Sequence, residues 1–213
     1  QDIKKEEPGL DILVINDGSG DQTGKIAQDS GATAVINLPV NLGIGGAIQT
    51  GFRYAQRNNY EVVVRLDGDH QHKAEEIKKI LKPVLAKEAD VVIGSRFLGG
   101  EQSYASPFWR RLGQQVISFF TSLLSGQKIT DSTSGFRCYS QSAVNLLNSY
   151  YPTDYPEPEE TIFLKKNKFK IKEEPVSMRE RKQGVSSLAS FRSLYYMVKV
   201  SLSLLISFLR TPV

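Results

Sequence analysis

Cysteine, histidine, methionine and tryptophan are all scarce in this chain of 213 residues. It contains one cysteine, Cys138, with two histidines, two methionines and one tryptophan. A single cysteine excludes an internal disulfide, which fits a reducing compartment. Because Cys138 lies in an apolar, strand-like run, we expect a buried and inert thiol rather than a nucleophile.

A strong excess of charge of one sign is also lacking. Lysine and arginine number 27 against 23 acidic residues, which gives a net charge of +4 and an isoelectric point near 9.0. This balance suits an anionic lipid, a nucleotide or a phosphate. It is too weak to indicate nucleic acid, and no aromatic–basic RNA-binding motif accompanies it. With 40% hydrophobic residues, the length suffices for one domain with a substantial core.

The chain has no uninterrupted apolar run of the length that crosses a membrane, about 20 residues. Its most apolar stretch, residues 194–209, is shorter and is interrupted by Lys199. We expect residues 189–213 to form a helix in the membrane interface, with Arg192 and Arg210 near the headgroups. The alternatives are a core helix, a helix that joins two copies in a homo-oligomer and, least favoured, a transmembrane span.

Short apolar runs alternate with helical patterns, which predicts an α/β fold with a mostly parallel sheet flanked by helices. The predicted strands are residues 11–16, 33–37, 61–66, 90–94, 135–139 and 169–176. The predicted helices are residues 22–30, 45–57, 74–87, 108–124 and 140–149, with another from Glu160 after a proline-punctuated loop. Polar motifs follow the strands, where open α/β sheets bind ligands.

Residues 62–71 are the most informative stretch, because an apolar run ends there in Asp67, Asp69 and Gln71. Alternate residues of an extended segment point the same way, so these three side chains can converge. Two crowded carboxylates repel unless a cation sits between them, and hard oxygen ligands suit Mg²⁺ or Mn²⁺. We therefore predict a metal site here, with Gly68 allowing the backbone to bend. The alternative is a solvated turn after a strand.

The two histidines in or beside this stretch, His70 and His72, are not assigned as ligands, and His72 is expected to be exposed. The carboxylate of Asp17 can accept from a base or a ribose hydroxyl, or can cap a helix instead. Gly43 and Gly46 lack the Lys-Ser/Thr of a phosphate-binding loop, so we favour a tight turn and close helix packing over contact with a pyrophosphate. A dinucleotide-binding dehydrogenase is disfavoured for the same reason.

Five motifs, taken in order, resemble those of family 2 glycosyltransferases of the GT-A fold. They are residues 14–19 (VINDGS), 41–47 (NLGIGGA), 67–69 (DGD), 94–97 (GSRF) and 131–137 (DSTSGFR). Within that family the chain is most similar to the branch of dolichol-phosphate mannose synthase and polyprenyl-phosphate glycosyltransferases. The resemblance implies a GT-A domain over residues 1–188 that lacks the strand and helix with which the family opens, a piece that carries part of the nucleotide site.

The resemblance also implies a role for each matching residue. The expected donor-binding residues are Asp17, Gly18, Ser19, Asn41, Gly43, Gly46, Asp67, Gly68 and Asp131. The expected catalytic residues are Asp69, Arg96, Arg110, Arg181 and Glu157. The three arginines match positions that grip the acceptor phosphate and the donor diphosphate, because a guanidinium pairs with two phosphate oxygens at once.

Other residues carry alternatives. Arg179 is the alternative to Arg181 as a phosphate ligand. Glu159 is the alternative to Glu157, which we expect to accept a hydrogen bond from a hydroxyl of the sugar. Arg137 is the arginine that we interpret as one half of a structural ion pair. Residues 182–187 resemble a flexible loop that closes over the donor.

The implied reaction is inverting transfer of a hexose or N-acetylhexosamine from a UDP- or GDP-sugar to a polyprenyl phosphate. The acceptor would be undecaprenyl or dolichyl phosphate, and the enzyme would lie peripherally on the cytoplasmic face of a membrane. One alternative is transfer to a sugar hydroxyl in surface polysaccharide synthesis, with a general base among the acids at 154–160. Another is a non-catalytic nucleotide-sugar-binding fragment, which the intact Asp67 and Asp69 argue against.

Overall fold

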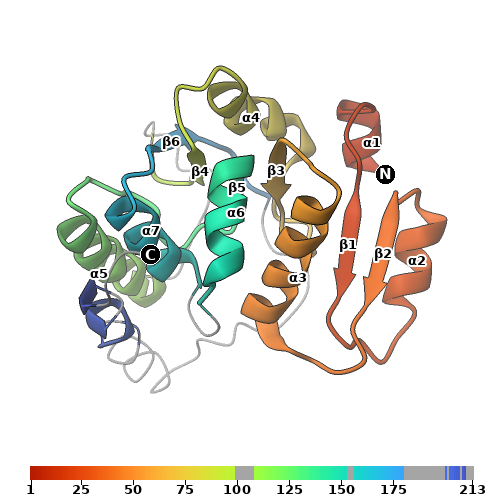
Figure 1. The fold of residues 1–213 in the computed structure, drawn as a ribbon, viewed down its shortest axis with the longest axis horizontal. Helices are drawn as coiled ribbons and strands as arrows, with labels where there is room; N and C mark the ends of the chain where they lie inside the picture. Colours follow the sequence, from red (N-terminus) through yellow and green to blue (C-terminus); the bar gives the residue numbers. More distant parts are fainter. Residues whose placement is uncertain (99–107, 153–155, 180–199, 201, 207, 210–213) are drawn as a thin grey trace.

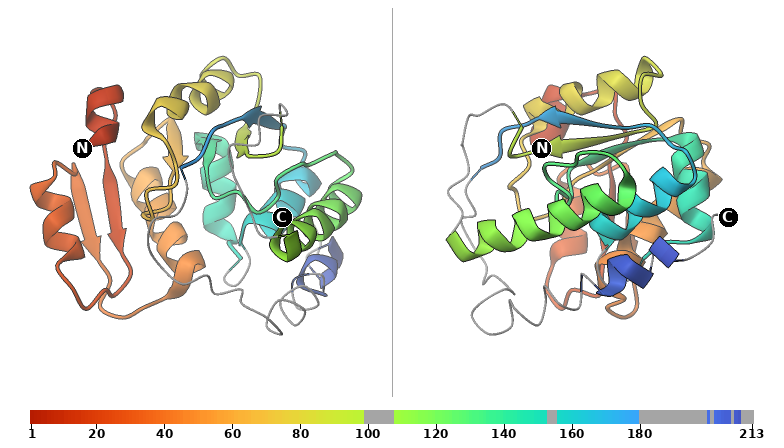
Figure 2. Two further views of the ribbon diagram at one scale, coloured as in Figure 1. Left: turned by 180° about the vertical axis from the view of Figure 1, so that it is seen from behind. Right: turned by 90° about the vertical axis from the view of Figure 1, so that its left-hand side faces the viewer.

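The computed structural model describes residues 1–98, 108–152, 156–179, 200, 202–206 and 208–209, and of residues 108–110 the backbone alone. Within these residues, helices cover both faces of a central sheet (Figure 1). Figure 2 shows α4 on one face of that sheet, with α5 and α7 on the other.

The strands form two sheets. β1 (Leu13–Asn16) and β2 (Ala34–Asn37) make a parallel pair. The second sheet has four strands in the order β3 (Val62–Arg65), β5 (Arg137–Ser140), β4 (Val91–Ser95) and β6 (Ile171–Pro175). β4 and β6 are parallel, whereas β5 is antiparallel to β3 and β4. The predicted α/β fold is confirmed, but the parallel direction does not extend to β5, because local periodicity does not encode how a long connection returns.

The helices follow the predicted pattern closely. They are α1 (Asp2–Glu6), α2 (Thr23–Asp29), α3 (Gly43–Arg57), a 3-10 turn (Ala74–Glu76) leading into α4 (Ile77–Leu85), α5 (Phe108–Ser125), α6 (Gln141–Ser149) and α7 (Pro156–Lys166). The prediction that the last of these starts at Glu160 is wrong. It begins at Pro156, because proline is well tolerated at the first helical position, where its missing N–H is not needed.

Alternate side chains of β4 enter hydrophobic clusters on opposite faces of the sheet. Val91 and Ile93 pack with residues of α3, α6 and α7, whereas Val92 packs with residues of α4. Cys138 lies in the α4 cluster and is fully buried, and burial raises the pKa of its thiol to about 12. The predicted buried thiol is therefore confirmed.

Buried charges tie α7 to β5. Nη1 of Arg137 donates to Oε1 of Glu160 over 2.8 Å, and both side chains are 0% exposed. The hydroxyls of Tyr139 and Tyr151 donate to the same carboxylate over 2.9 and 2.8 Å. The predicted structural ion pair of Arg137 is confirmed. Because an unpaired buried charge is costly, this cluster fixes the position of α7 against the sheet.

The described residues near the C-terminus pack beside α5 and α7. Val200 and Leu204 are buried together with Ile117 and Ile162. Most of the interfacial helix predicted over residues 189–213 lies outside the described residues. Among the residues that are described, no helix combines the length and apolarity needed to cross a membrane.

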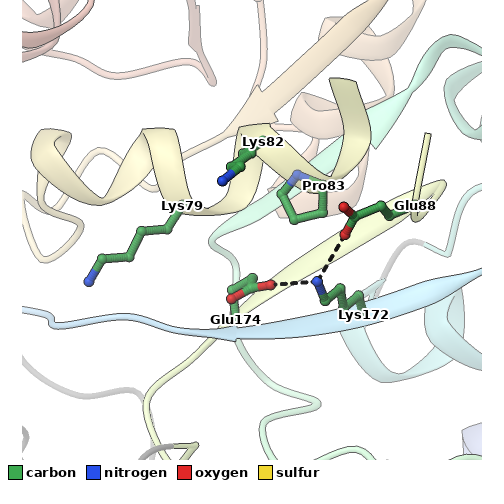
Figure 3. Close-up of a pocket in the computed structure, with 6 residues that line it drawn as sticks. All are labelled: Lys79, Lys82, Pro83, Glu88, Lys172 and Glu174. Atoms are coloured by element: carbon green, nitrogen blue, oxygen red, sulfur yellow. Dashed lines mark hydrogen bonds and ion pairs between the residues drawn. The ribbon is translucent and has the colours of Figure 1, made fainter. Parts of the chain in front are cut away.

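We predict that Glu160→Gln lowers the free energy of unfolding by about 3–5 kcal/mol, because it leaves Arg137 buried without its counter-charge. Urea denaturation followed by circular dichroism measures the loss. The matched control is Glu88→Gln, which breaks an exposed ion pair of 3.2 Å with Lys172 (Figure 3) and should cost far less stability, because solvent screens both charges. Equal losses in the two variants would contradict the proposed role of the buried pair.

Candidate functional site

The turn after β3 carries the two carboxylates predicted to bind a metal. The N–H of Gln71 donates to Oδ1 of Asp69 over 3.1 Å, and the N–H of Asp67 donates to Nδ1 of His72 over 3.1 Å. The prediction that His72 is exposed is wrong, because its ring stacks on Phe136 with 4.9 Å between centroids. Burial lowers the pKa of His72 in spite of the nearby carboxylates, so the imidazole is neutral and accepts at Nδ1.

The backbone of this turn bends at His70, whose φ of 63° is left-handed. The predicted bend at Gly68 is confirmed, since Gly68 and Asp69 form a turn, although Gly68 does not need a positive φ to make it. Arg179, at the far side of the turn, donates its N–H to the carbonyl of Gln71 over 2.8 Å, and its guanidinium lies 2.9 Å from Nε2 of His70 and 3.1 Å from Asp2. Arg179, an alternative phosphate ligand in the sequence, thus braces this turn.

The carboxylate of Asp67 lies directly against Gly135. A Cβ at position 135 would stand 2.6 Å from Oδ2 of Asp67, closer than real Cβ contacts come. A side chain at residue 135 would therefore displace the carboxylate of Asp67 from this position. Gly135 belongs to the motif at residues 131–137, but only the folded chain reveals that this glycine serves Asp67.

The chemistry of the turn fits a small divalent cation. Asp67, Asp69 and Gln71 offer carboxylate and amide oxygens, the hard donors that Mg²⁺ and Mn²⁺ prefer. Among the described residues, no cluster of three or more His, Cys, Asp or Glu side chains could hold a metal. A cation bound at this turn would therefore rely on the two carboxylates and take further oxygens from the amide, from water or from a phosphorylated ligand.

Arg65, the last residue of β3, is a site residue that the sequence analysis missed. Its side chain is 7% exposed, and Nη2 makes a close ion pair with Oε1 of Glu157. The same Nη2 lies 3.5 Å from Oδ1 of Asp67, while Nη1 is buried without a hydrogen-bond partner. Burial opposes the charge, but Glu157 and other groups outweigh burial and raise the pKa of Arg65. The only local signal was a charged residue at the end of an apolar run.

The acids of α7 are engaged by other side chains. Burial would raise the pKa of Glu157, but Arg65 and Arg137 outweigh it and hold that pKa below the ordinary value. Glu159 and Glu160 also accept hydrogen bonds from neighbouring side chains. A carboxylate with a lowered pKa is a weak proton acceptor near neutral pH, so Glu157 is poorly suited to general-base catalysis.

Asp131 holds Arg96 in a fork. Nε and Nη2 of Arg96 donate to the two oxygens of Asp131, each over 2.7 Å, and Asp131 is fully buried. Glu173 on β6 fixes the loop before them by accepting from the N–H groups of Thr130 and Asp131 over 2.8 and 2.9 Å. Asp131 therefore orients Arg96, and one edge of the guanidinium is already used in doing so. Glu173 is a second residue that the sequence analysis missed.

A second group of predicted residues lies after β1. Oδ1 of Asp17 accepts from the N–H of Leu42 over 2.7 Å, and the side chain of Asn41 donates to the carbonyl of Asp17 over 3.2 Å. Gly18 has a φ of +71°, and a Cβ there would lie 2.7 Å from the backbone nitrogen of Asn41. Ser19 is exposed beside them. These contacts join the loop after β1 to the start of α3.

The glycines at the start of α3 allow a backbone conformation and a close approach that other residues would not. Gly43 has a φ of +78°, and a Cβ on Gly46 would lie 2.6 Å from Cβ of Leu42. The tight turn predicted for this cluster is therefore confirmed at Gly43.

The structure thus places Asp67 against Gly135 and links Asp67 to Glu157 through Arg65, and it joins Asp17 to Asn41 separately. The side chain of Arg110, and Arg181 with the loop at 182–187, lie outside the described residues. A surface hollow between α4 and β6 includes none of the predicted residues (Figure 3). Lys172 in this hollow is paired with both Glu88 and Glu174, so the hollow has no evident part in the chemistry.

Comparison of the sequence with known proteins identifies related families and relatives. Residues 2–147 match the family model described as Glycosyl transferase family 2. A UDP-N-acetylglucosamine–dolichyl-phosphate N-acetylglucosaminyltransferase of Methanococcus voltae is 31% identical over 183 residues, 78% of this chain and 73% of that protein. A polyprenol monophosphomannose synthase of Mycolicibacterium smegmatis is 32% identical over 208 residues, 91% of this chain and 76% of that protein.

A solved structure gives a likeness of fold. It is glucosyl-3-phosphoglycerate synthase of Mycobacterium tuberculosis, in complex with Mn²⁺, uridine diphosphate and glucosyl-3-phosphoglycerate. The TM-score is 0.67 at 19% identity, and the match covers 99% of this chain and 75% of that chain.

We predict that Gly135→Ala weakens the binding of Mn²⁺ by about tenfold or more, because the added methyl group displaces the carboxylate of Asp67. Titration of Mn²⁺, followed by the electron paramagnetic resonance signal of the free ion, measures the change. Gly9→Ala is the matched control, since a Cβ at residue 9 meets nothing within 4 Å. Unchanged Mn²⁺ affinity in a folded Gly135→Ala protein would contradict the assignment of Asp67.

Proposed function

The chain belongs to glycosyl transferase family 2 and has the GT-A fold. From this premise we propose that it transfers the sugar of a nucleoside-diphosphate sugar to a polyprenyl phosphate. The names of the two relatives described above, each more than 30% identical, include a dolichyl phosphate and a polyprenol monophosphomannose. The proposed donor is a UDP- or GDP-linked hexose or N-acetylhexosamine, and the proposed acceptor is undecaprenyl or dolichyl phosphate.

One observation carries the choice of a phosphate acceptor. Transfer to a sugar hydroxyl needs a general base, whereas a phosphate acceptor has a second pKa near 6 and is already an anion. The described acids of α7 are all engaged, and the pKa of Glu157 is lowered rather than raised. A phosphate acceptor is consistent with this arrangement, because its own oxygen attacks the anomeric carbon without help from a base.

In the proposed reaction a phosphate oxygen of the lipid bonds to the anomeric carbon as the bond from that carbon to the nucleoside diphosphate breaks, with inversion. Asp67, Asp69 and Gln71 would hold Mg²⁺ or Mn²⁺, which when bound supplies positive charge against the departing diphosphate. Arg96, whose guanidinium Asp131 orients, is the proposed contact of β4 with a phosphate group.

The remaining predicted residues complete this proposal. Asp17 and its neighbours after β1 would bind the nucleoside. Arg110 and Arg181 are proposed to grip the acceptor phosphate, following their match to the family motifs. The sugar itself is not assigned to a side chain.

Exposed apolar side chains support a peripheral position on a membrane, for which we propose the cytoplasmic face. On α5, Phe119 and Leu123 are 65% and 66% exposed. Beside it, Leu202 and Leu209 are 57% and 73% exposed, and Val200 and Leu204 of the same segment are buried against α5 and α7. An element with a buried side and an exposed apolar side is suited to lie in the interface of a bilayer that holds the lipid acceptor.

The proposed reaction predicts organic-extractable product from one radiolabelled donor among a panel of UDP- and GDP-sugars, with Mn²⁺ and undecaprenyl phosphate present. Asp69→Asn should lower that product about a hundredfold or more, because the leaving diphosphate loses its counter-charge. Label that appears only on sugar hydroxyl acceptors would contradict a phosphate acceptor.

The proposed membrane contact predicts that Phe119→Ser/Leu123→Ser lowers the partition coefficient of the protein onto phosphatidylglycerol vesicles about a hundredfold or more, since each side chain contributes about 1.5–3 kcal/mol on burial. Ile26→Ser/Leu85→Ser is the matched control, because these residues are 58% and 59% exposed on other helices. Equal losses in both double variants would count against a specific membrane face.

A further inference from the structure

Arg65 stands between two carboxylates that lie on different elements. Glu157, in the first turn of α7, makes the close ion pair with Nη2 of Arg65. Asp67, two residues along the chain from Arg65, lies 3.5 Å from that same nitrogen, beyond the usual hydrogen-bond distance. The guanidinium therefore has one strong partner and one weaker partner.

This arrangement matters because Arg65 never loses its charge and is buried. A buried guanidinium needs a carboxylate, and only two are within reach of Nη2 in the described structure. If Glu157 did not hold Arg65, the guanidinium would take Asp67 as its full partner. The guanidinium of Arg65 would then occupy the carboxylate of Asp67 that is proposed to bind the metal ion.

We propose that Glu157 is a positioning residue that anchors Arg65 and thereby keeps Asp67 available to a divalent cation. The inference rests on the proposed metal site of the turn after β3. In this role Glu157 binds an arginine of the protein, whereas the sequence resemblance implied that it accepts a hydrogen bond from a hydroxyl of the sugar. The role also explains why an arginine is tolerated beside a metal-binding carboxylate, since that arginine is neutralised from α7.

Two features of the site support the anchor. Glu157 lies in the first turn of an α-helix, where the backbone N–H groups favour a negative side chain. Its carboxylate also lies in the field of Arg137, which together with Arg65 holds the pKa of Glu157 below the ordinary value. Glu157 therefore stays ionised at neutral pH and remains a constant partner for Arg65.

A double-mutant cycle with Mn²⁺ alone as the probe tests the anchor. Glu157→Gln keeps the shape of the side chain and removes its charge, so Arg65 should move to Asp67 and Mn²⁺ affinity should fall about tenfold or more. In the background of Arg65→Gln no guanidinium competes, and the same Glu157→Gln change should alter Mn²⁺ affinity less than about twofold.

Equal fold-losses in the two backgrounds would overturn the proposal, because they would mean that Glu157 acts only as a distant negative charge. Should Arg65→Gln not fold, Glu157→Asp gives a second test. It keeps the charge but withdraws the carboxylate by one methylene, and we expect Mn²⁺ affinity to fall several-fold; unchanged affinity would overturn the anchor.

Asp69→Asn separates this inference from the proposed metal site. Loss of Mn²⁺ binding in Asp69→Asn, with no change in Glu157→Gln, would leave the metal site standing and remove the anchor. Unchanged Mn²⁺ binding in Asp69→Asn would remove the metal site, and the anchor with it. Urea unfolding of each variant checks that the folded protein is the species titrated.

Discussion

Neutralisation of two buried arginines is the constraint on which the rest of this structure depends. Arg65 and Arg137 stand at the end of β3 and the start of β5, and their side chains are 7% and 0% exposed. Charges withdrawn from water in this way require partners, and α7 supplies them as Glu157 and Glu160. These two ion pairs fix the position of α7 against the sheet, and α7 in turn supports the candidate site.

The loops that carry Asp67, Asp131 and Gly135 are also joined by specific contacts. Gly135 lets the carboxylate of Asp67 pack against the loop that follows residue 131. Asp131, in the same loop, holds Arg96 at the end of β4. Each contact joins the end of one strand to the end or flank of another. Residues far apart in the chain therefore converge at the strand ends of the sheet, where open α/β sheets bind ligands.

Local pattern predicted much of the fold and part of the site. Hydrophobic periodicity located the strands and most helices, and the Asp67 motif was recognisable because its chemistry is contained in a few consecutive residues. The departures have a common cause. The direction of β5, the burial of His72 beneath Phe136, and the partners of Arg65 and Glu173 depend on residues distant in the sequence. No local period encodes such pairings.

A crystal structure with Mn²⁺ and a nucleoside diphosphate, UDP or GDP, would test the central claim most directly. Anomalous scattering would locate the metal without reference to the surrounding density. We predict a metal peak bonded to oxygens of the Asp67–Asp69 turn, with Arg65 still paired to Glu157. A metal peak away from that turn, or Arg65 paired with Asp67 in the metal-bound protein, would contradict it.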